Sequence, residues 1–510
     1  MSVLSPPASP IHGPWPAQTF IEKRWPGPAG AASPATVWAV IAGALIAALS
    51  VPLAPGGAGW LVAAIAGVAA LTIARPPAEP VSLVRWQRPG LDRSRFAWGA
   101  ATIALLAVST VRAAGWLVLL CLAPAFLTGI LAVAGGRTTK GILLTVWAAP
   151  AAAFRSVPWL KSGARGPGSG GVRIAATVGV SLALLIVFGT LFASADAAFA
   201  GVVDAVIPDL DVATALRWIL LFTVGLLVLG GAAYLRAAPP DLSGLDSQHR
   251  RRVARLEWSI PLSLLVLLFA VFVGIQLTVL FGDSQHVLTT EGLTYAEYAR
   301  TGFWQLLLVT GLTLLVLAGA ARWAPRDTRT DRVLIRSVLG TLAVLTLVIV
   351  GSALHRMDLY ADTYGLTRLR LLVPLCEAWL GVVFLMILMA GIRLRTAWLP
   401  RAVVAAGVLA LLGLAAANPD RLIAERNIVR AHDVGSIDIA FLSTLSVDAV
   451  PALDKLPPAD RNCALRLMAA QLGERDGDWR TWSWSREEAR KILDAHPVAD
   501  GRNCPLLVRS

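Results

Sequence analysis

Charged residues are scarce in this sequence. They make up 15% of its 510 residues, whereas 56% are hydrophobic. A soluble protein needs enough polar surface to hide its apolar side chains from water, and this composition cannot supply it. A surface that faces lipid removes the problem. The composition therefore argues against an ordinary soluble domain and predicts an integral membrane protein whose main partner is the lipid bilayer.

Catalytic and metal-binding signatures are also missing. The sequence has no HExxH motif, no phosphate-binding P-loop, no CxxC pair and no Ser-x-x-Lys pair. His432 and His496 stand alone, without metal-ligand spacing around them. We therefore expect no metal and no cofactor, and the sequence leans away from an enzyme.

Eleven apolar runs are long enough, or nearly so, to cross a bilayer. A helix needs about 17–25 mostly apolar residues to span roughly 30 Å of hydrocarbon. The runs lie at 37–54, 59–74, 96–111, 113–134, 172–193, 216–235, 257–281, 301–320, 333–353, 372–392 and 401–417. A further stretch, 141–154, contains Pro150 and is expected to be an interfacial helix. The sequence thus predicts an all-α bundle of about eleven spans over residues 37–417, with ten or twelve as alternatives.

Lys and Arg alternate strongly between the predicted loops. One set of loops carries roughly 26 of them and the other set roughly 5, which places the N-terminus in the cytoplasm and residues 418–510 outside. The net charge of +13 is explained by these cytoplasmic loops, so we expect no nucleic-acid binding. The basic loop 236–256 is instead suited to anionic lipids or to a protein partner.

The segments outside the spans differ in composition. Residues 1–36 are rich in Pro and Gly and are predicted to be a disordered cytoplasmic tail, and 161–171 a flexible cytoplasmic loop. Residues 418–510 are predicted to form a small helical extracytoplasmic domain, with a capping box at 485–488 that opens its last helix. A small core is expected around three tryptophans, with the membrane surface as their alternative position. These are Trp479, Trp482 and Trp484.

Polar residues of the membrane domain gather at one face. Glu377 lies inside the run 372–392, about six residues or roughly 9 Å from its outer end. A carboxylate at that depth needs a partner and indicates a functional site. The predicted ligand-binding residues are Glu377, its proposed partners Arg300, Arg356 and Arg370, and Tyr298, Glu297, His355 and Tyr364. An ion-pair network that only ties helix ends together explains the same residues.

Several strings at these positions resemble a bacterial family of multi-spanning membrane proteins, catalogued as domain of unknown function 4153/4173. They are YAEYARTGF at 295–303, HRMDLY at 355–360, YGLTRLR at 364–370, SADAAF at 194–199, the stretch 418–428 and LSVD at 445–448. The resemblance covers roughly residues 95–460. It implies a multi-pass protein of the bacterial plasma membrane and assigns no activity.

Three functions of different classes fit the sequence. The first is the binding or translocation of a small ligand or ion through the polar cluster at the outer face. The second is a membrane sensor, or an assembly partner of an envelope system. The third is a membrane enzyme that acts on an envelope lipid or glycan.

The two cysteines of the C-terminal domain test the predicted topology. In an oxidising compartment Cys463 and Cys504 can pair, and closing a loop of roughly 40 residues stabilises a fold by about 3–4 kcal/mol. We expect a membrane-impermeant thiol reagent to label them in intact cells only after reduction. Labelling that requires cell lysis would show that the topology is inverted.

Overall fold

The computed structural model describes residues 25–52, 56–74, 89–136, 138–165, 170–196, 199, 201, 212–241, 254–281, 295–325, 328–393, 396–473, 477–499 and 504. All regular structure in these ranges is helical. The long helices are α2 (Pro34–Ser50), α3 (Ala58–Ile73), α4 (Pro89–Val111), α5 (Gly115–Ala134), α6 (Thr139–Ala164), α7 (Gly170–Ala195), α9 (Val212–Ala237), α10 (Arg255–Phe281), α12 (Tyr295–Trp323), α13 (Arg329–Tyr364), α14 (Arg368–Arg393) and α15 (Leu399–Ala416).

The helices present their apolar side chains outward as well as inward. Within the described residues, nine helices are long and apolar enough to cross a membrane, and α2 and α3 are shorter apolar helices. Large apolar side chains are exposed along them, for example Leu185 and Leu264. Each predicted apolar run overlaps one of these helices. An all-helical bundle with an apolar exterior is a multi-pass membrane protein.

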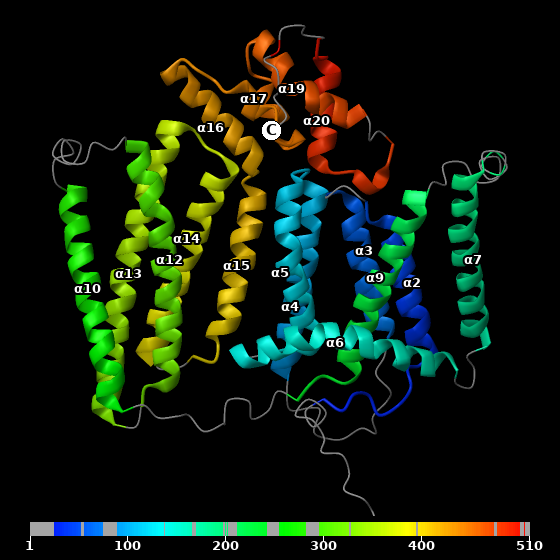
Figure 1. The fold of residues 1–510 in the computed structure, drawn as a ribbon, viewed down its shortest axis with the longest axis horizontal. Coiled ribbons are helices and arrows are strands. Elements are labelled where there is room, and N and C mark those ends of the chain that lie inside the picture. The colour runs from blue at the N-terminus through cyan, green and yellow to red at the C-terminus, as the bar shows by residue number, and fades with distance from the viewer. Residues whose placement is uncertain are drawn as a thin grey trace, which may run out of the picture.

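The helix α6 differs from the others in direction. By length and composition it would also qualify as a span, but Figure 1 shows it lying across the end of the bundle, nearly at right angles to its neighbours. It contains the stretch 141–154 that was predicted as interfacial. Its close packing on α9 depends on small residues: a methyl group built on Gly231 would lie 2.9 Å from the backbone nitrogen of Ala153.

The spanning helices form two groups that meet at α15. One group contains α2 to α5 and α9, and the other contains α10, α12, α13 and α14 (Figure 1). Residues of α15 such as Val408 and Leu414 share a buried core with Leu105 of α4 and Leu117 of α5. Leu371 of α14 packs against the same core. The second group has its own core around Phe384 and Leu342.

The C-terminal part forms a helical cap on the end of the bundle opposite α6 (Figure 1). We call that end the cap end. The cap consists of α16 (Pro419–Val434), α17 (Ile439–Leu442), η2 (Val447–Ala449), α18 (Val450–Leu453), α19 (Pro458–Gly473), η3 (Trp479–Thr481) and α20 (Trp484–Ala495). Its aliphatic core includes Leu442, Leu453 and Leu465. A disulfide joins Cys463 and Cys504, the pair that the sequence suggested.

Two details of the cap differ from the predictions. The last helix begins at Trp484, and Ser483 is its N-cap, with its side chain accepting a hydrogen bond from the backbone N–H of Arg486. The N-cap therefore lies two residues before Ser485, with which the expected capping box at 485–488 begins. Trp479, Trp482 and Trp484 are 52%, 40% and 65% exposed, so the core expected around them is wrong. The aliphatic side chains of α16 to α19 already fill the interior.

The disordered tail predicted over residues 1–36 extends too far along the chain. Residues 1–24 lie outside the described residues, but Trp25 is buried, and its indole N–H donates to the carbonyl of Ala238 at 2.8 Å. The guanidinium of Arg155 lies 4.8 Å from the centre of its ring. The predicted flexible loop 161–171 is also shorter, because 161–164 belong to α6 and 170–171 to α7. In both segments, contacts with the helix bundle hold residues in place although their composition indicates disorder.

The buried carboxylate of Asp420, at the start of α16, ties the cap to two spanning helices. It accepts hydrogen bonds from Arg368 at the start of α14, at 3.0 and 2.8 Å, and from the indole of Trp116 in α5 at 3.1 Å. The backbone N–H of Ser446 in the cap donates at 2.8 Å. Burial alone raises the pKa of Asp420, but the bonds from Arg368 and Ser446 outweigh it and hold the pKa below its usual range.

A second buried aspartate, Asp448, fixes the cap to the turn between α4 and α5. Its carboxylate accepts from the backbone N–H of Ala113 at 3.0 Å and of Ala114 at 2.7 Å. The hydroxyl of Ser446 lies 2.9 Å from the same carboxylate. Because both aspartates also bind Ser446, the two attachments form one network.

Replacing Asp420 should loosen the cap. Breaking a buried ion pair typically costs 3–5 kcal/mol, and we expect Asp420→Ala to cost about 3 kcal/mol because Arg368 is about one-third exposed. The contribution of a carboxylate with a lowered pKa is complete above about pH 4 and is lost as the pH falls through that pKa. Thermal unfolding of the purified protein should therefore separate the variant from wild type at neutral pH and less in acid. Asp494→Ala, on the exposed side of α20, is the matched control, and an equal loss in both variants would contradict this role.

Candidate functional site

The polar segment 355–364 is helical. It lies between the apolar runs 333–353 and 372–392, where a loop is expected, but α13 continues to Tyr364 and the turn to α14 is only residues 365–367. A helix of 36 residues is about 54 Å long, well beyond the roughly 30 Å of hydrocarbon, so its last turns project past the bundle. The helix ends at Gly365, where φ is +79°, a conformation that favours glycine.

Arg370 braces this turn. Its guanidinium donates to the carbonyls of Tyr364 and Gly365 at 2.8 and 2.7 Å, and to the hydroxyl of Tyr360 at 3.2 Å. It also lies 4.5 Å from the centre of the Tyr360 ring. These contacts occupy Arg370, so its predicted pairing with Glu377 is wrong.

Among the described residues, Glu377 has no partner. Its side chain is 1% exposed, and neither carboxyl oxygen receives a hydrogen bond. The predicted ion pairs with Arg356 and Arg370 are therefore not formed, and the side chain of Arg300 lies outside those described. Because α14 starts at Arg368, Glu377 lies nine residues into the helix, roughly 14 Å, which is deeper than the run of apolar residues suggested.

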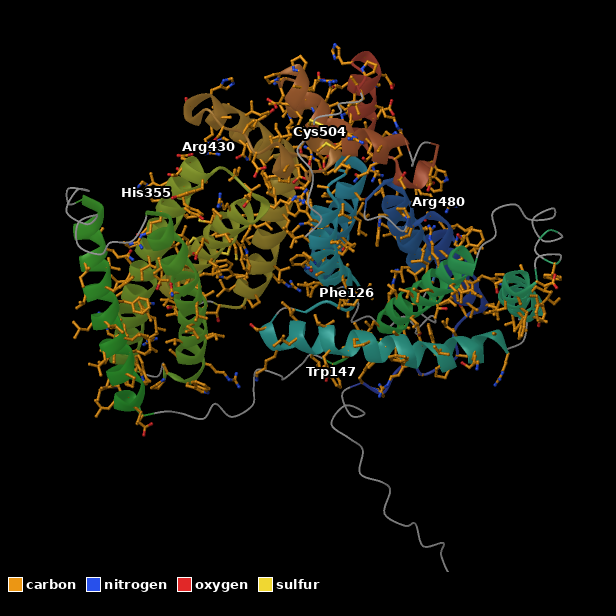
Figure 2. All side chains as sticks on the ribbon, turned by 45° about the horizontal axis from the view of Figure 1, so that its top comes forward. Phe126, Trp147, His355, Arg430, Arg480 and Cys504 are labelled. Atoms are coloured by element: carbon orange, nitrogen blue, oxygen red, sulfur yellow. A yellow bond between two sulfur atoms is a disulfide. The ribbon has the colours of Figure 1, made fainter. Side chains whose placement is uncertain are left out.

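A cavity of about 630 Å³ opens at the cap end, between the last turns of α13, the first turns of α14 and one side of α16. Figure 2 shows His355 of α13 and Arg430 of α16 near each other at this position. Its polar lining residues are His355, Asp358 and Asp362 of α13, Arg370 of α14, and Arg426, Arg430 and Asp433 of α16. Apolar residues, among them Leu354, Leu371 and Pro374, line the rest.

The two long walls of the cavity carry opposite net charges, because Arg426 and Arg430 outweigh Asp433 on α16. Asp358 and Asp362 are one turn apart on α13, and Arg426 and Arg430 are one turn apart on α16. Within the described part of the chain, Asp358, Asp362 and Arg426 form no ion pair. Arg430 donates to the carbonyl of Thr363 at 3.1 Å, while its buried Nε has no partner. Charges without internal partners are available to a ligand.

The sequence predicted part of this site. His355 and Arg370 line the cavity, and Tyr364 contributes a carbonyl to Arg370. Arg356 lies on α13 but does not line the cavity, and the side chains of Glu297, Tyr298 and Arg300 lie outside those described. The three charged residues of α16 were missed. Their signal was the spacing of Arg426 and Arg430, which puts both on one face of a helix.

These features define a multi-pass membrane protein with a helical cap and a charged cavity beneath it. The family model described as Domain of unknown function (DUF4153) matches residues 100–456, from α4 into the cap, and includes every residue that lines the cavity. The chain belongs to this family, which confirms the resemblance seen in the sequence. No curated protein and no solved structure matches the chain.

Proposed function

We propose that this protein binds a small amphiphile with a charged head group in the cavity, at the outer face of the bacterial plasma membrane. The orientation is supported by the uneven distribution of Lys and Arg among the loops, which assigns the cap end to the outside. The pairing of Cys463 with Cys504 agrees with that side, because disulfides persist in oxidising compartments.

The proposal rests on one observation: the cavity combines two walls of opposite net charge with an apolar surface between them. A phosphate or carboxylate fits between Arg426 and Arg430, and an amine or hydroxyl group of the same ligand fits against Asp358 and Asp362. Leu371 and Pro374 offer an apolar surface to a hydrocarbon chain. The volume of about 630 Å³ lies within the range of small-molecule sites.

The position of the cavity favours a ligand from the membrane. It lies where α13 and α14 leave the bundle, which is the level of lipid head groups if the cap is outside. A lipid of the outer leaflet can reach this level without crossing the bilayer. We therefore propose a phospholipid, with translocation as a later step of the same function.

A membrane enzyme is the second candidate. Asp358, Asp362 and Asp433 line the cavity together, and paired carboxylates can act as general acid and base. This candidate differs from binding alone in its product. It requires that a bound lipid or glycan be chemically altered.

The binding proposal is tested by replacing both arginines of α16. Charge-assisted hydrogen bonds contribute about 1.5–3 kcal/mol, so Arg426→Gln with Arg430→Gln should weaken lipid binding at least tenfold. Native mass spectrometry of the protein with phosphatidylethanolamine, phosphatidylglycerol or glycerol phosphate measures this and separates lipid from free phosphate. Arg466→Gln, on an exposed part of α19, is the matched control.

Unchanged lipid binding in the double variant would contradict the proposal, as would binding of glycerol phosphate as tight as that of the lipids. The same spectra test the enzyme candidate. It requires the mass of the bound lipid to change with time, and it requires Asp358→Asn to stop that change without loss of binding.

A further inference from the structure

Four buried side chains in the second helix group have polar atoms without a hydrogen-bond partner. They are both carboxyl oxygens of Glu377 in α14, the side-chain oxygen of Gln276 and the indole N–H of Trp258 in α10, and the hydroxyl of Ser352 in α13. Their exposed fractions are 1%, 7%, 7% and 7%. Buried polar atoms are nearly always paired, so Glu377, the only acid among the four, requires an explanation.

Glu377 faces α13. The antiparallel helix α14 packs closely on α13, because a methyl group built on Gly381 would lie 3.3 Å from Val350. One turn nearer the cap, Glu377 is therefore level with residue 354. Ser352 lies on the other side of α13 from Val350, because two residues turn a helix by about 200°.

Glu377 lies directly below the cavity. Pro374, which lines the cavity, is three residues before Glu377 on the same face of α14. On α13 the cavity reaches Leu354, which is level with Glu377. One turn of helix, about 5 Å, therefore separates the carboxyl group from the cavity floor.

The chemistry of Glu377 points to a proton. A buried, unpaired carboxylate is so costly that the group takes up a proton and becomes neutral. The protonated acid carries no charge and has one O–H donor. A metal ion fits less well, since no group of three or more His, Cys, Asp or Glu side chains in the described part of the chain could hold one.

The neighbouring charges leave Glu377 the only acidic group at this height among the described side chains. On α13, His355, Arg356 and Asp358 lie toward the cap, and Asp358 is one turn beyond Leu354. Arg370 of α14 is held by the turn. On α16, Asp420 binds Arg368, and Arg421 binds Glu425. The charged residues of α10 and α15 within the described ranges, Arg255, Glu257 and Arg401, lie toward the opposite end. On α12, the side chains of Glu297, Tyr298 and Arg300 are outside those described.

We propose that Glu377 is a proton-binding site within the membrane, which is loaded from the cavity. The proton comes from water in the cavity, forms an O–H bond on Glu377 and returns to the cavity when that bond breaks. The site exists whether or not a lipid binds above it. If the proposed function also holds, binding and proton uptake occur one helical turn apart, which is the arrangement that proton-coupled translocation needs.

Infrared difference spectroscopy of the full-length protein in nanodiscs tests the site. At neutral pH, wild type minus Glu377→Gln should show the C=O band of a protonated carboxylic acid, and the band should shift in D₂O. A carboxylate band in place of the acid band would overturn the proposal, and an acid band that does not shift in D₂O would overturn loading from the cavity.

The stability of the protein gives a second, independent test. Raising the pH would force an unpaired charge into the bundle, so wild type should lose thermal stability relative to Glu377→Gln as the pH rises. Glu488→Gln, on the cap, is the control and should follow wild type. Stabilisation by Na⁺ at constant pH that Glu377→Gln abolishes would show a sodium site instead. If the arginine double variant loses lipid binding but keeps the acid band, the two proposals stand separately.

Discussion

The carboxylate of Asp420 is the contact on which the arrangement of this protein depends. It lies at the point where the cap, α14 and α5 meet, and each of them donates a hydrogen bond to it. Because this bond set fixes the start of α16, it also fixes the side of α16 that faces the end of α13. The charged cavity exists only while α16 is held there. A structural ion pair thus defines the shape of the proposed binding site.

Asp420 and Glu377 show two outcomes of burying an acid in the same protein. Asp420 receives hydrogen bonds from Arg368, Trp116 and Ser446, which stabilise its charge. Glu377 receives none, although it is just as buried. A satisfied charge holds parts of a structure together, whereas an unsatisfied acid marks a place where a proton can be bound and released. This contrast separates the anchor of the cap from the site beneath the cavity.

The sequence was enough to predict the membrane helices, because hydropathy directly reports which segments prefer lipid. It also indicated His355 and Arg370, since charged residues beside apolar runs are conspicuous. It could not predict that α13 continues to Tyr364, because leaving the membrane does not end a helix. Nor could it predict that Arg370 braces a turn while Glu377 stays unpaired. Such pairings depend on side-chain geometry, and the bond between Trp116 and Asp420 joins residues 304 positions apart.

The central claim is that the cavity between α13, α14 and α16 is a ligand site. A high-resolution cryo-electron microscopy map of the wild-type protein in nanodiscs made from bacterial lipids tests it most directly. We expect elongated density in the cavity, with its head between Arg426 and Arg430 and its tail on Pro374. A well-resolved cavity that holds only water, or one closed by ion pairs between Asp358 or Asp362 and these arginines, would contradict it.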